Sequence, residues 1–354
     1  MTIKKILLPK HTKIRDTYTI DCFLGEGTFG GVYKVRHKYL GIQALKIFHQ
    51  GSISKEQEPE LFNEAYILSK ITHKNVVRVY EANTFKYSNN RFCYIAMEYV
   101  KGGTLADYIA SEIRLPLELA VKIQKDICSG LAKLHSSTPP LVHRDVKPQN
   151  IMLAVEEDNI VARVLDFGLA KHVDPITRIT EAAGTLAYLP PEGFWDYETP
   201  ASDVFSSGII FYIMLTGVSP YKMPSGCQAT KKNEIKIAIK ASRNRSPEPP
   251  SKFNSDLDDK IDEIILKALA TDMKKRYPTA AEFYNAIDQY QVKKFKTPDK
   301  NIQKAIQMGK QYSKLREAIA LLENSIAQQP KERQHYLMGK YTETLNNWKK
   351  GIIM

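Results

Sequence analysis

The stretch that decides the fold is His143-Arg144-Asp145-Val146-Lys147-Pro148-Gln149-Asn150, with Asp166-Phe167-Gly168 beginning sixteen residues after Asn150. It supplies a carboxylate that can accept a proton, Asp145, and a cation that can face a phosphate, Lys147. Asn150 and Asp166 add oxygen ligands of the kind that Mg²⁺ or Mn²⁺ prefers. Two linked motifs in this order are far harder to obtain by chance than either alone. We therefore expect a phosphate- and metal-binding site on a loop and on the strand end beside it.

The pattern resembles the catalytic loop and metal-binding motif of eukaryotic-type (Hanks-type) protein kinases, in which HRDxKPxN and DFG stand at this separation. The resemblance covers residues 18–290, and the short loops between motifs are similar to those of compact bacterial serine/threonine kinases. It implies an α+β, two-lobed protein kinase fold, with a small β-rich N-lobe containing one helix (18–98) and a larger helical C-lobe (103–290). It also implies ATP and Mg²⁺ (or Mn²⁺) as cofactors.

Composition bounds the class of protein. The chain has 354 residues, of which 43% are hydrophobic and 25% charged, so it has room for one large two-lobed domain and an appendage. It contains no apolar stretch of membrane-spanning length, and its N-terminus lacks the apolar core of a signal peptide. The four cysteines are far apart and form no CxxC pair, which favours reduced thiols, a cytoplasmic location and no zinc site.

Charge is concentrated at the C-terminal end. Residues 293–354 hold 13 of the 51 Lys/Arg and 5 of the 39 Asp/Glu, which is +8 of the total net charge of +12. A nucleic-acid or acidic partner is therefore expected only through this segment, where tyrosines and Trp348 could stack on bases. The alternative is a packed helical unit with a solvated basic surface. A homodimer is left open.

Hydrophobic periodicity predicts the elements. Strands are expected at 18–24, 31–36, 42–48, 76–81 and 92–98, and helices at 60–71, 117–135, 201–215, 257–270, 279–289, 315–327 and 335–348. Residues 1–17 are expected to be an N-terminal extension and 291–300 a linker. Residues 301–354 are expected to form a basic helical extension, either a tetratricopeptide-like repeat or a plain helical hairpin packed on the larger domain.

The resemblance also assigns a nucleotide site. Gly25-Glu26-Gly27-Thr28-Phe29-Gly30 lies between two predicted strands, where a glycine-rich hairpin can lay backbone amides over a triphosphate. Lys46 would contact the α- and β-phosphates and pair with Glu64, for which Glu60 is the competitor. The adenine would be bounded by side chains and hinge backbone at Val32, Ala44, Met97, Glu98, Val100 and Met152.

The catalytic roles follow from the same resemblance. Asp145 would orient the substrate hydroxyl and accept its proton, Lys147 would stabilise the transferring phosphoryl group, and Asn150 and Asp166 would hold the metal. Glu192 would pair with Arg276, and Asp203 would cap the catalytic-loop backbone. Lys147 and Thr185 stand where serine/threonine kinases carry these residues, which favours hydroxyl acceptors on protein substrates.

Regulation and alternatives remain open at the level of sequence. Arg144 could pair with a phosphate on Thr177 or Thr180, which predicts activation-loop autophosphorylation, although both could equally be exposed loop threonines. A pseudokinase scaffold is disfavoured because Lys46, Asp145, Asn150 and Asp166 are all present. A small-molecule kinase on the same scaffold is the remaining alternative.

Overall fold

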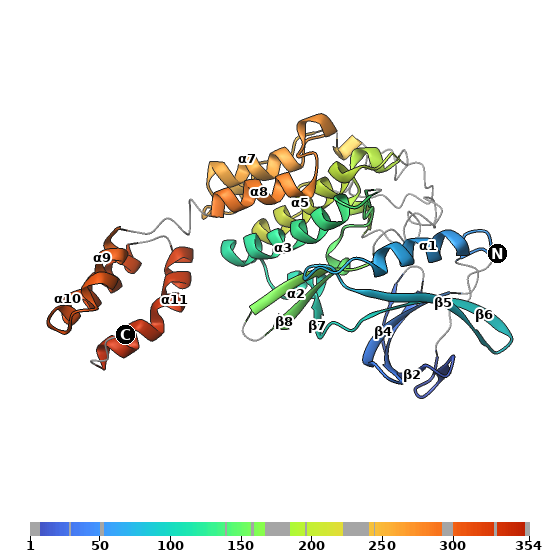
Figure 1. The fold of residues 1–354 in the computed structure, drawn as a ribbon. Helices are drawn as coiled ribbons and strands as arrows, with labels where there is room; N and C mark the ends of the chain where they lie inside the picture. The colour runs from blue at the N-terminus through green and yellow to red at the C-terminus, as the bar shows by residue number, and fades with distance from the viewer. Residues whose placement is uncertain are drawn as a thin grey trace.

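The computed structural model describes most of the chain, namely residues 8–27, 30–49, 53–138, 140–156, 159–166, 185–194, 197–221, 241–243, 245–291, 300–328 and 331–350. A β-rich N-terminal half is followed by a helical half, as predicted, and a separate group of helices closes the chain (Figure 1).

The N-terminal lobe is built on an antiparallel sheet of six described strands, in the order β1-β2-β3-β4-β6-β5. Helix α1 (Glu58–Ser69) packs against β5 on one face of this sheet (Figure 1). The strands are β1 (Lys13–Ile14), β2 (Tyr18–Gly27), β3 (Gly30–His37), β4 (Gly41–Phe48), β5 (Val79–Tyr87) and β6 (Asn90–Glu98).

Both faces of this sheet are buried. Because successive residues of a strand point to opposite faces, Ile95 and Met97 join the main core beneath α1, whereas Tyr94 and Ala96 join a second core on the outer face. Residues Leu8 and Ile14, ahead of β2, belong to this second core. Leu8 is buried there and its N–H donates to the Tyr33 hydroxyl at 3.2 Å. The segment predicted as an N-terminal extension thus contributes to the packing of this lobe.

The C-terminal lobe is helical, and α5 (Pro200–Thr216) runs through its centre with nearly every residue buried. Proline at its first position and a capping box between Thr199 and Ser202 start this helix. Gly217 ends it with φ 73°, and a Cβ there would lie 2.1 Å from the Ile113 carbonyl oxygen, so only glycine fits. Around it stand α3 (Leu117–His135), α7 (Asp259–Ala268) and α8 (Ala280–Gln291), whereas α2 (Leu105–Ser111) lies beside the 3₁₀ helix at Pro148–Asn150.

A small antiparallel sheet joins the two lobes and carries the catalytic loop. It contains β7 (Gly102–Thr104), β8 (Ile151–Glu156) and β9 (Asn159–Val164). A 3₁₀ helix at Pro148–Asn150 leads directly into β8. Val164 accepts a hydrogen bond from the Val77 N–H and donates one to the Asn75 carbonyl, which links β9 to the segment that follows α1.

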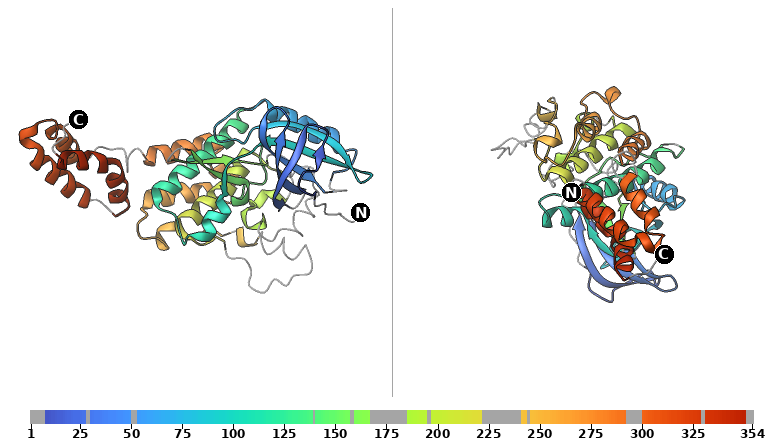
Figure 2. Two further views of the ribbon diagram at one scale, coloured as in Figure 1. Left: turned by 90° about the horizontal axis from the view of Figure 1, so that it is seen from below. Right: turned by 90° about the vertical axis from the view of Figure 1, so that its left-hand side faces the viewer.

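The C-terminal extension contains three described helices, α9 (Lys300–Met308), α10 (Leu315–Ala327) and α11 (Lys331–Lys349), at one end of the molecule (Figures 1 and 2). They share a hydrophobic core of their own, and α11 contacts α3. The ring of Trp348 lies against Gly309, where a Cβ would come within 2.0 Å of the indole. The members of this core are Ile302, Ala305, Leu315, Ala318, Leu322, Ile326, Leu337, Leu345 and Trp348.

Most predicted elements are confirmed to within a few residues, and α3 and α10 have the predicted bounds. Three differences stand out. Helix α9 was not predicted and begins at Lys300, inside the expected linker. The strand expected at 76–81 begins later, at Val79, and runs to Tyr87. Strands β8 and β9 were not predicted either. In the part of the chain that the structure describes, no helix is both long and apolar enough to cross a bilayer.

Candidate active site

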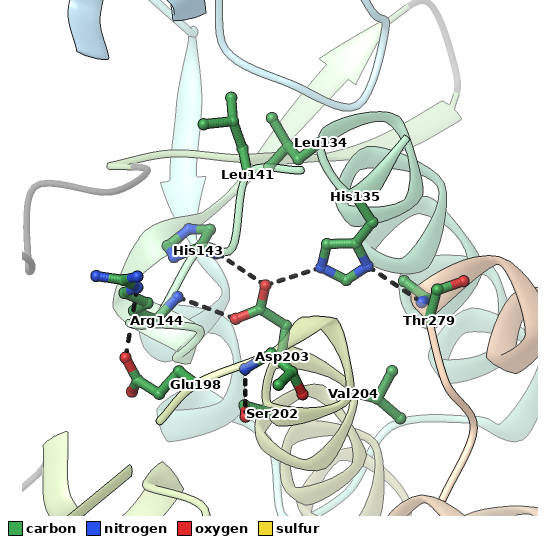
Figure 3. Close-up of polar contacts among 12 residues, drawn as sticks. Leu134, His135, Leu141, His143, Arg144, Glu198, Ser202, Asp203, Val204 and Thr279 are labelled. Carbon is green, nitrogen blue, oxygen red and sulfur yellow. Dashed lines mark hydrogen bonds and ion pairs between the residues drawn. The ribbon is translucent and has the colours of Figure 1, made fainter. Parts of the chain in front are cut away.

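The catalytic loop is held from below by one buried carboxylate at the start of α5. Asp203 accepts hydrogen bonds from the backbone N–H groups of His143 (2.8 Å) and Arg144 (2.9 Å) and from the ring of His135 (2.9 Å), as Figure 3 shows. Burial acts to raise the pKa of Asp203, but the hydrogen bonds and the nearby histidines outweigh it and hold the pKa below its usual range. The predicted cap on the catalytic loop is therefore present.

Two histidines complete this support through the backbone. His135 Nδ1 accepts a hydrogen bond from the Ala280 N–H at 3.2 Å. The ring proton is therefore on Nε2, which donates a hydrogen bond to Asp203 (Figure 3). His143 Nδ1 accepts the Asp145 N–H at 3.3 Å, and its Nε2 donates to the Leu165 carbonyl at 2.7 Å. Both ring nitrogens of His143 thus hold backbone, which suits a structural role.

The Asp145 carboxylate is oriented by two side chains from its own loop. Lys147 Nζ lies 2.8 Å from Asp145 Oδ2, and the Asn150 amide donates to the same oxygen at 3.0 Å and to the Asp145 carbonyl at 2.8 Å. Charge-assisted hydrogen bonds of this kind fix a carboxylate in one direction. The sequence-predicted base and phosphate-binding lysine therefore lie side by side, both mostly shielded from solvent.

The two predicted metal ligands come from neighbouring backbone. The Leu165 N–H donates to the Asn150 carbonyl at 2.9 Å, which places Asp166 beside the end of the catalytic loop. The Asn150 amide nitrogen is used on Asp145, so the amide oxygen is the atom that can bind a cation. One carboxylate and one amide oxygen fit Mg²⁺, which takes few protein ligands and completes its shell with phosphate and water. Among the described residues, no cluster of three or more His, Cys, Asp or Glu forms another metal site.

Lys46 is buried in β4, with 5% of its surface exposed, and its ammonium forms an ion pair with Asp166 at 2.7 Å. The predicted partner was Glu64 on α1, which has interactions of its own, and its pairing with Lys46 stays a prediction. A buried ammonium needs an adjacent carboxylate, and Asp166 supplies it. The catalytic role assigned to Glu64 stays a prediction.

Apolar side chains from both lobes surround the space next to Lys46. Val32 is the cross-strand partner of Lys46, and Ala44 is the partner of Met97. Met152, on β8, packs against the same core as Val32. A small cavity lies behind Met97, between α1 and the sheet, and is lined by Ala65, Leu68, Val77, Val79, Ile95, Met97 and Asp166. Met97 lines this inner cavity, and its role in guarding the predicted adenine site stays a prediction.

The glycine-rich hairpin contains glycines of two kinds. Gly27 pairs with Gly30 at its tip, while Thr28 and Phe29 fall outside the described residues. A Cβ on Gly30 would lie 2.1 Å from the Ile47 carbonyl oxygen, so packing against β4 requires glycine there. Among the described atoms, a Cβ on Gly25 would meet nothing within 4 Å, and one on Gly27 would make only an ordinary contact. The protein's own packing does not require these two, which suits close approach by a ligand.

The predicted hinge follows β6. The Glu98 N–H donates to the Arg78 carbonyl at 2.8 Å, and the Glu98 side chain pairs with Arg163 of β9. Val100 is buried just beyond. The Glu98 backbone N–H is therefore already bonded within the protein, and an adenine would have to use other backbone groups of this segment.

The segment after the activation loop is fastened to the C-lobe by a buried ion pair. Arg276 Nη1 and Nη2 contact the two Glu192 carboxylate oxygens at 2.6 and 2.9 Å, as predicted. The Ser206 hydroxyl of α5 also donates to the Tyr188 carbonyl at 2.8 Å. Thr185 begins this described segment, whereas Phe167, Gly168, Thr177 and Thr180 lie outside the described residues.

Two charged residues near this segment were not predicted. Arg243 is 1% exposed, donates to the carbonyls of Ala187 (2.6 Å) and Leu189 (3.3 Å), and lies 4.1 Å over the Tyr221 ring. Burial lowers the pKa of Arg243 to about 10, with Tyr221 opposing the shift, so the side chain stays charged at neutral pH. Glu198 Oε2 lies 3.5 Å from Arg144 Nε (Figure 3). Neither residue carries a sequence signal, since one lies in a basic run and the other in a loop.

The chain is similar to known proteins over about three quarters of its length. Residues 18–286 match the family model described as protein kinase domain. The chain is 34% identical over 273 residues to the probable serine/threonine-protein kinase CPE1738 of Clostridium perfringens, covering 75% of this chain and 37% of that protein. It is 31% identical over 286 residues to the serine/threonine-protein kinase PknB of Mycobacterium leprae, covering 77% and 42%. The chain thus spans less than half the length of these curated relatives.

Solved structures show the same architecture. The crystal structure of the PknI kinase domain of Mycobacterium tuberculosis matches with a TM-score of 0.61 at 22% identity, covering 80% of this chain and 99% of that one. A mutant form of the same domain matches with a TM-score of 0.60. The predicted two-lobed fold is confirmed.

Proposed function

Because this chain belongs to the protein kinase family, we propose that it transfers the γ-phosphoryl group of ATP to serine or threonine hydroxyls of protein substrates. The observation that carries the proposal is the arrangement of Asp145, Lys147 and Asn150 on one loop, with Asp166 and Lys46 beside it. This set combines a proton acceptor, two cations and two metal ligands in one place, which is the requirement of phosphoryl transfer.

Each side chain has a distinct task in this proposal. Asp145, oriented by Lys147 and Asn150, accepts the proton of the substrate hydroxyl as the oxygen attacks phosphorus. Lys147 and Lys46 stabilise negative charge on the transferring group and on the phosphates next to it. Asn150 and Asp166 would hold Mg²⁺, which supplies further charge neutralisation when it is bound.

The nucleotide is proposed to lie between the glycine-rich hairpin and β8. Gly25, Glu26, Gly27 and Gly30 would cover the phosphates, and the apolar side chains of Val32, Ala44, Met97 and Met152 would enclose the adenine. Backbone groups around Glu98 and Val100 would bind its polar edge. We further propose residues 18–290 as the catalytic domain and the helices after residue 300 as a separate basic extension.

The acceptor is proposed to be a serine or threonine because relatives of about this similarity bear that name and because Lys147 contacts Asp145 directly. Autophosphorylation at Thr177 or Thr180 belongs to the same proposal. The free thiols of Cys22, Cys93 and Cys128 support a reducing compartment such as the cytoplasm as the place of the reaction.

The test is phosphate transfer from ATP and Mg²⁺ to a serine/threonine peptide and to the protein itself, measured by mass. Asp166→Asn serves as the inactive control, and Asp256→Asn, at an exposed surface pair, as the matched active control. Transfer by the wild type and by Asp256→Asn, but not by Asp166→Asn, is the expected result. Transfer that survives in Asp166→Asn, or ATP binding with no transfer by any protein, contradicts the proposal.

A further inference from the structure

Arg144, the residue before the proposed base, is held through its backbone and through its side chain by residues of the segment 198–203. Its backbone N–H donates to Asp203 Oδ1 at 2.9 Å, and its side-chain Nε lies 3.5 Å from Glu198 Oε2 (Figure 3). Arg144 has φ 68°, in the left-handed region that costs a non-glycine residue conformational energy. Such a conformation persists only where contacts enforce it, and here two carboxylates do so.

Glu198 and Asp203 lie on either side of the start of α5. Thr199, next to Glu198, is the N-cap of this helix, and its N–H donates to the Ser202 hydroxyl at 3.0 Å. Ser202 in turn donates to Glu192 at 2.7 Å. The backbone that carries Glu198 is therefore fixed by the helix start and by the Glu192–Arg276 pair, and its side chain can serve as a rigid anchor.

Burial makes the Arg144–Glu198 contact different from a surface ion pair. The Glu198 side chain is 5% exposed and that of Arg144 is 27% exposed. The Asp203 carboxylate already receives two backbone N–H groups and His135. Among the described residues, Glu198 is therefore the carboxylate that faces the Arg144 guanidinium. A charge pair shielded from water is screened little by salt and is costly to break from one side.

We propose that Glu198 is a built-in counter-ion that positions Arg144, and through it Asp145, in the absence of any phosphate on the activation segment. In enzymes that phosphorylation activates, such an arginine commonly becomes ordered only when it pairs with the added phosphate. Here a carboxylate of the chain itself takes that place, so a phosphate would be a second anion and would add little. Glu198 is a positioning residue, and the inference rests on the proposed kinase function.

The test uses the full chain, treated with a phosphatase and shown by intact mass to carry no phosphate. Steady-state kinetics with a serine/threonine peptide are compared for the wild type, Glu198→Gln, Arg144→Ala and the double variant. Glu248→Gln is the matched control, because Glu248 pairs with Lys252 at the exposed surface. Thermal melting checks the fold of each protein.

The expected result is a dephosphorylated wild type that is active and a Glu198→Gln variant whose kcat falls by about 10- to 100-fold, with the KM for ATP unchanged. In the Arg144→Ala background, Glu198→Gln should change nothing further, because both substitutions remove one interaction. Glu198→Gln isolated with a phosphorylated activation segment should recover kcat, whereas Arg144→Ala should not. A purely structural role for Glu198 predicts neither result.

Three outcomes overturn the inference. Wild-type kcat in dephosphorylated Glu198→Gln shows that the carboxylate is not needed, and additive losses in the double variant show that it does not act through Arg144. A dephosphorylated wild type that is inactive until its activation segment is phosphorylated shows that Glu198 does not replace the phosphate. If Glu198→Gln does not fold, Glu198→Asp keeps the charge with a shorter reach and should give a partial loss that phosphorylation restores. A wild type inactive in every state fails the proposed function itself.

Discussion

The C-terminal lobe and the C-terminal extension bury different kinds of side chain. Around α5 the interior contains charged groups, among them Glu192, Asp203, Arg243 and Arg276. In the described part of the extension, Ser325 is the buried polar residue, and the rest of the buried set is apolar. Both regions are helical and closely packed, so secondary structure does not explain the contrast.

The two regions differ in the kind of structure that their buried side chains have to hold in place. Three helices need only be kept in contact, and apolar burial, which has no direction, is sufficient for that. The catalytic loop and the segment at 185–194 are irregular backbone whose N–H and carbonyl groups need partners in particular positions. Buried charges provide those partners. The comparison predicts that single substitutions in the lobe disturb stability and activity together, whereas those in the extension disturb only its own packing.

The largest effect is expected for Asp203→Asn. The substitution replaces an acceptor of three hydrogen bonds by an amide that turns a donor toward at least one of them. We expect a loss of about 3–5 kcal/mol of unfolding free energy and a collapse of phosphotransfer. Urea unfolding and peptide kinetics measure both. A stable, active variant would contradict the view that buried charges hold the irregular backbone of the C-terminal lobe. Asp256→Asn, at the surface, is the control.

The same substitution has a defined pH dependence. The pKa of Asp203 is lowered in the folded protein, because its hydrogen bonds and nearby histidines outweigh the effect of burial. Its charge therefore stabilises the fold above the unfolded pKa of about 4, and this contribution is lost as the pH falls through the folded pKa. The gap in stability between wild type and Asp203→Asn should be constant near neutrality and shrink below about pH 4. A gap that widens in acid contradicts the assignment.

Arg276→Met is expected to cost somewhat less, about 3 kcal/mol. Methionine keeps much of the apolar stem but leaves Glu192 buried without its bidentate partner. Activity should fall as well, because the segment at 185–194 loses its anchor. Chemical denaturation with Arg114→Met as the control, a partner in an exposed pair, separates burial from loss of charge. Equal losses in the two variants would count against the comparison.

Leu322→Ala tests the extension. Leu322 is fully buried in its core, and the cavity should cost about 2–3 kcal/mol of local stability, because a small unit can partly collapse around it. Calorimetry should show a lowered transition for the extension, while the phosphotransfer rate stays that of the wild type. Leu321→Ala, at the half-buried neighbouring position, should have a smaller effect. A matching drop in kcat would show that the two regions are coupled.

The smallest effect is expected for Lys349→Ala. Lys349 pairs with Glu323 at 2.7 Å, but both side chains are about half exposed, and such pairs contribute about 0–1 kcal/mol. The melting temperature of the extension should barely change, and the change should be smaller still in high salt, because salt screens the exposed pair. A shift as large as that of Leu322→Ala would mean that charge, too, holds the extension together.

The sequence predicted best what depends on local spacing. The bounds of α3 follow from helical periodicity, and the cluster of Asp145, Lys147 and Asn150 lies within six residues of chain. What it missed depends on distant contacts. Arg243 lies in the basic run Lys240-Ala241-Ser242-Arg243-Asn244-Arg245, which is typical of a solvated surface, whereas the fold buries it against Tyr221 and the backbone at 187–189.

The sequence also did not show which carboxylates pair with Lys46 and Arg144. Lys46 needed a carboxylate, and the sequence predicted Glu64 on the following helix, with Glu60 as the competitor, whereas Asp166 lies 120 residues further along the chain. The choice of Asp166 depends on where β9 ends relative to β4, which is set by tertiary packing. Glu198 stands five residues before Asp203 in a loop, and no periodicity marks it. Its importance emerges only once the fold brings it beside Arg144.

The buried start of the chain has a practical consequence for anyone who produces the protein. A fragment cut at residue 18, where the family match begins, would strip Leu8 and Ile14 from the outer face of the sheet. The rings of Tyr18, Tyr33 and Tyr94 would then face water, as an open apolar surface that invites self-association. A shortened protein should therefore begin before Leu8, and an affinity tag should be joined through a spacer so that it does not compete for that face.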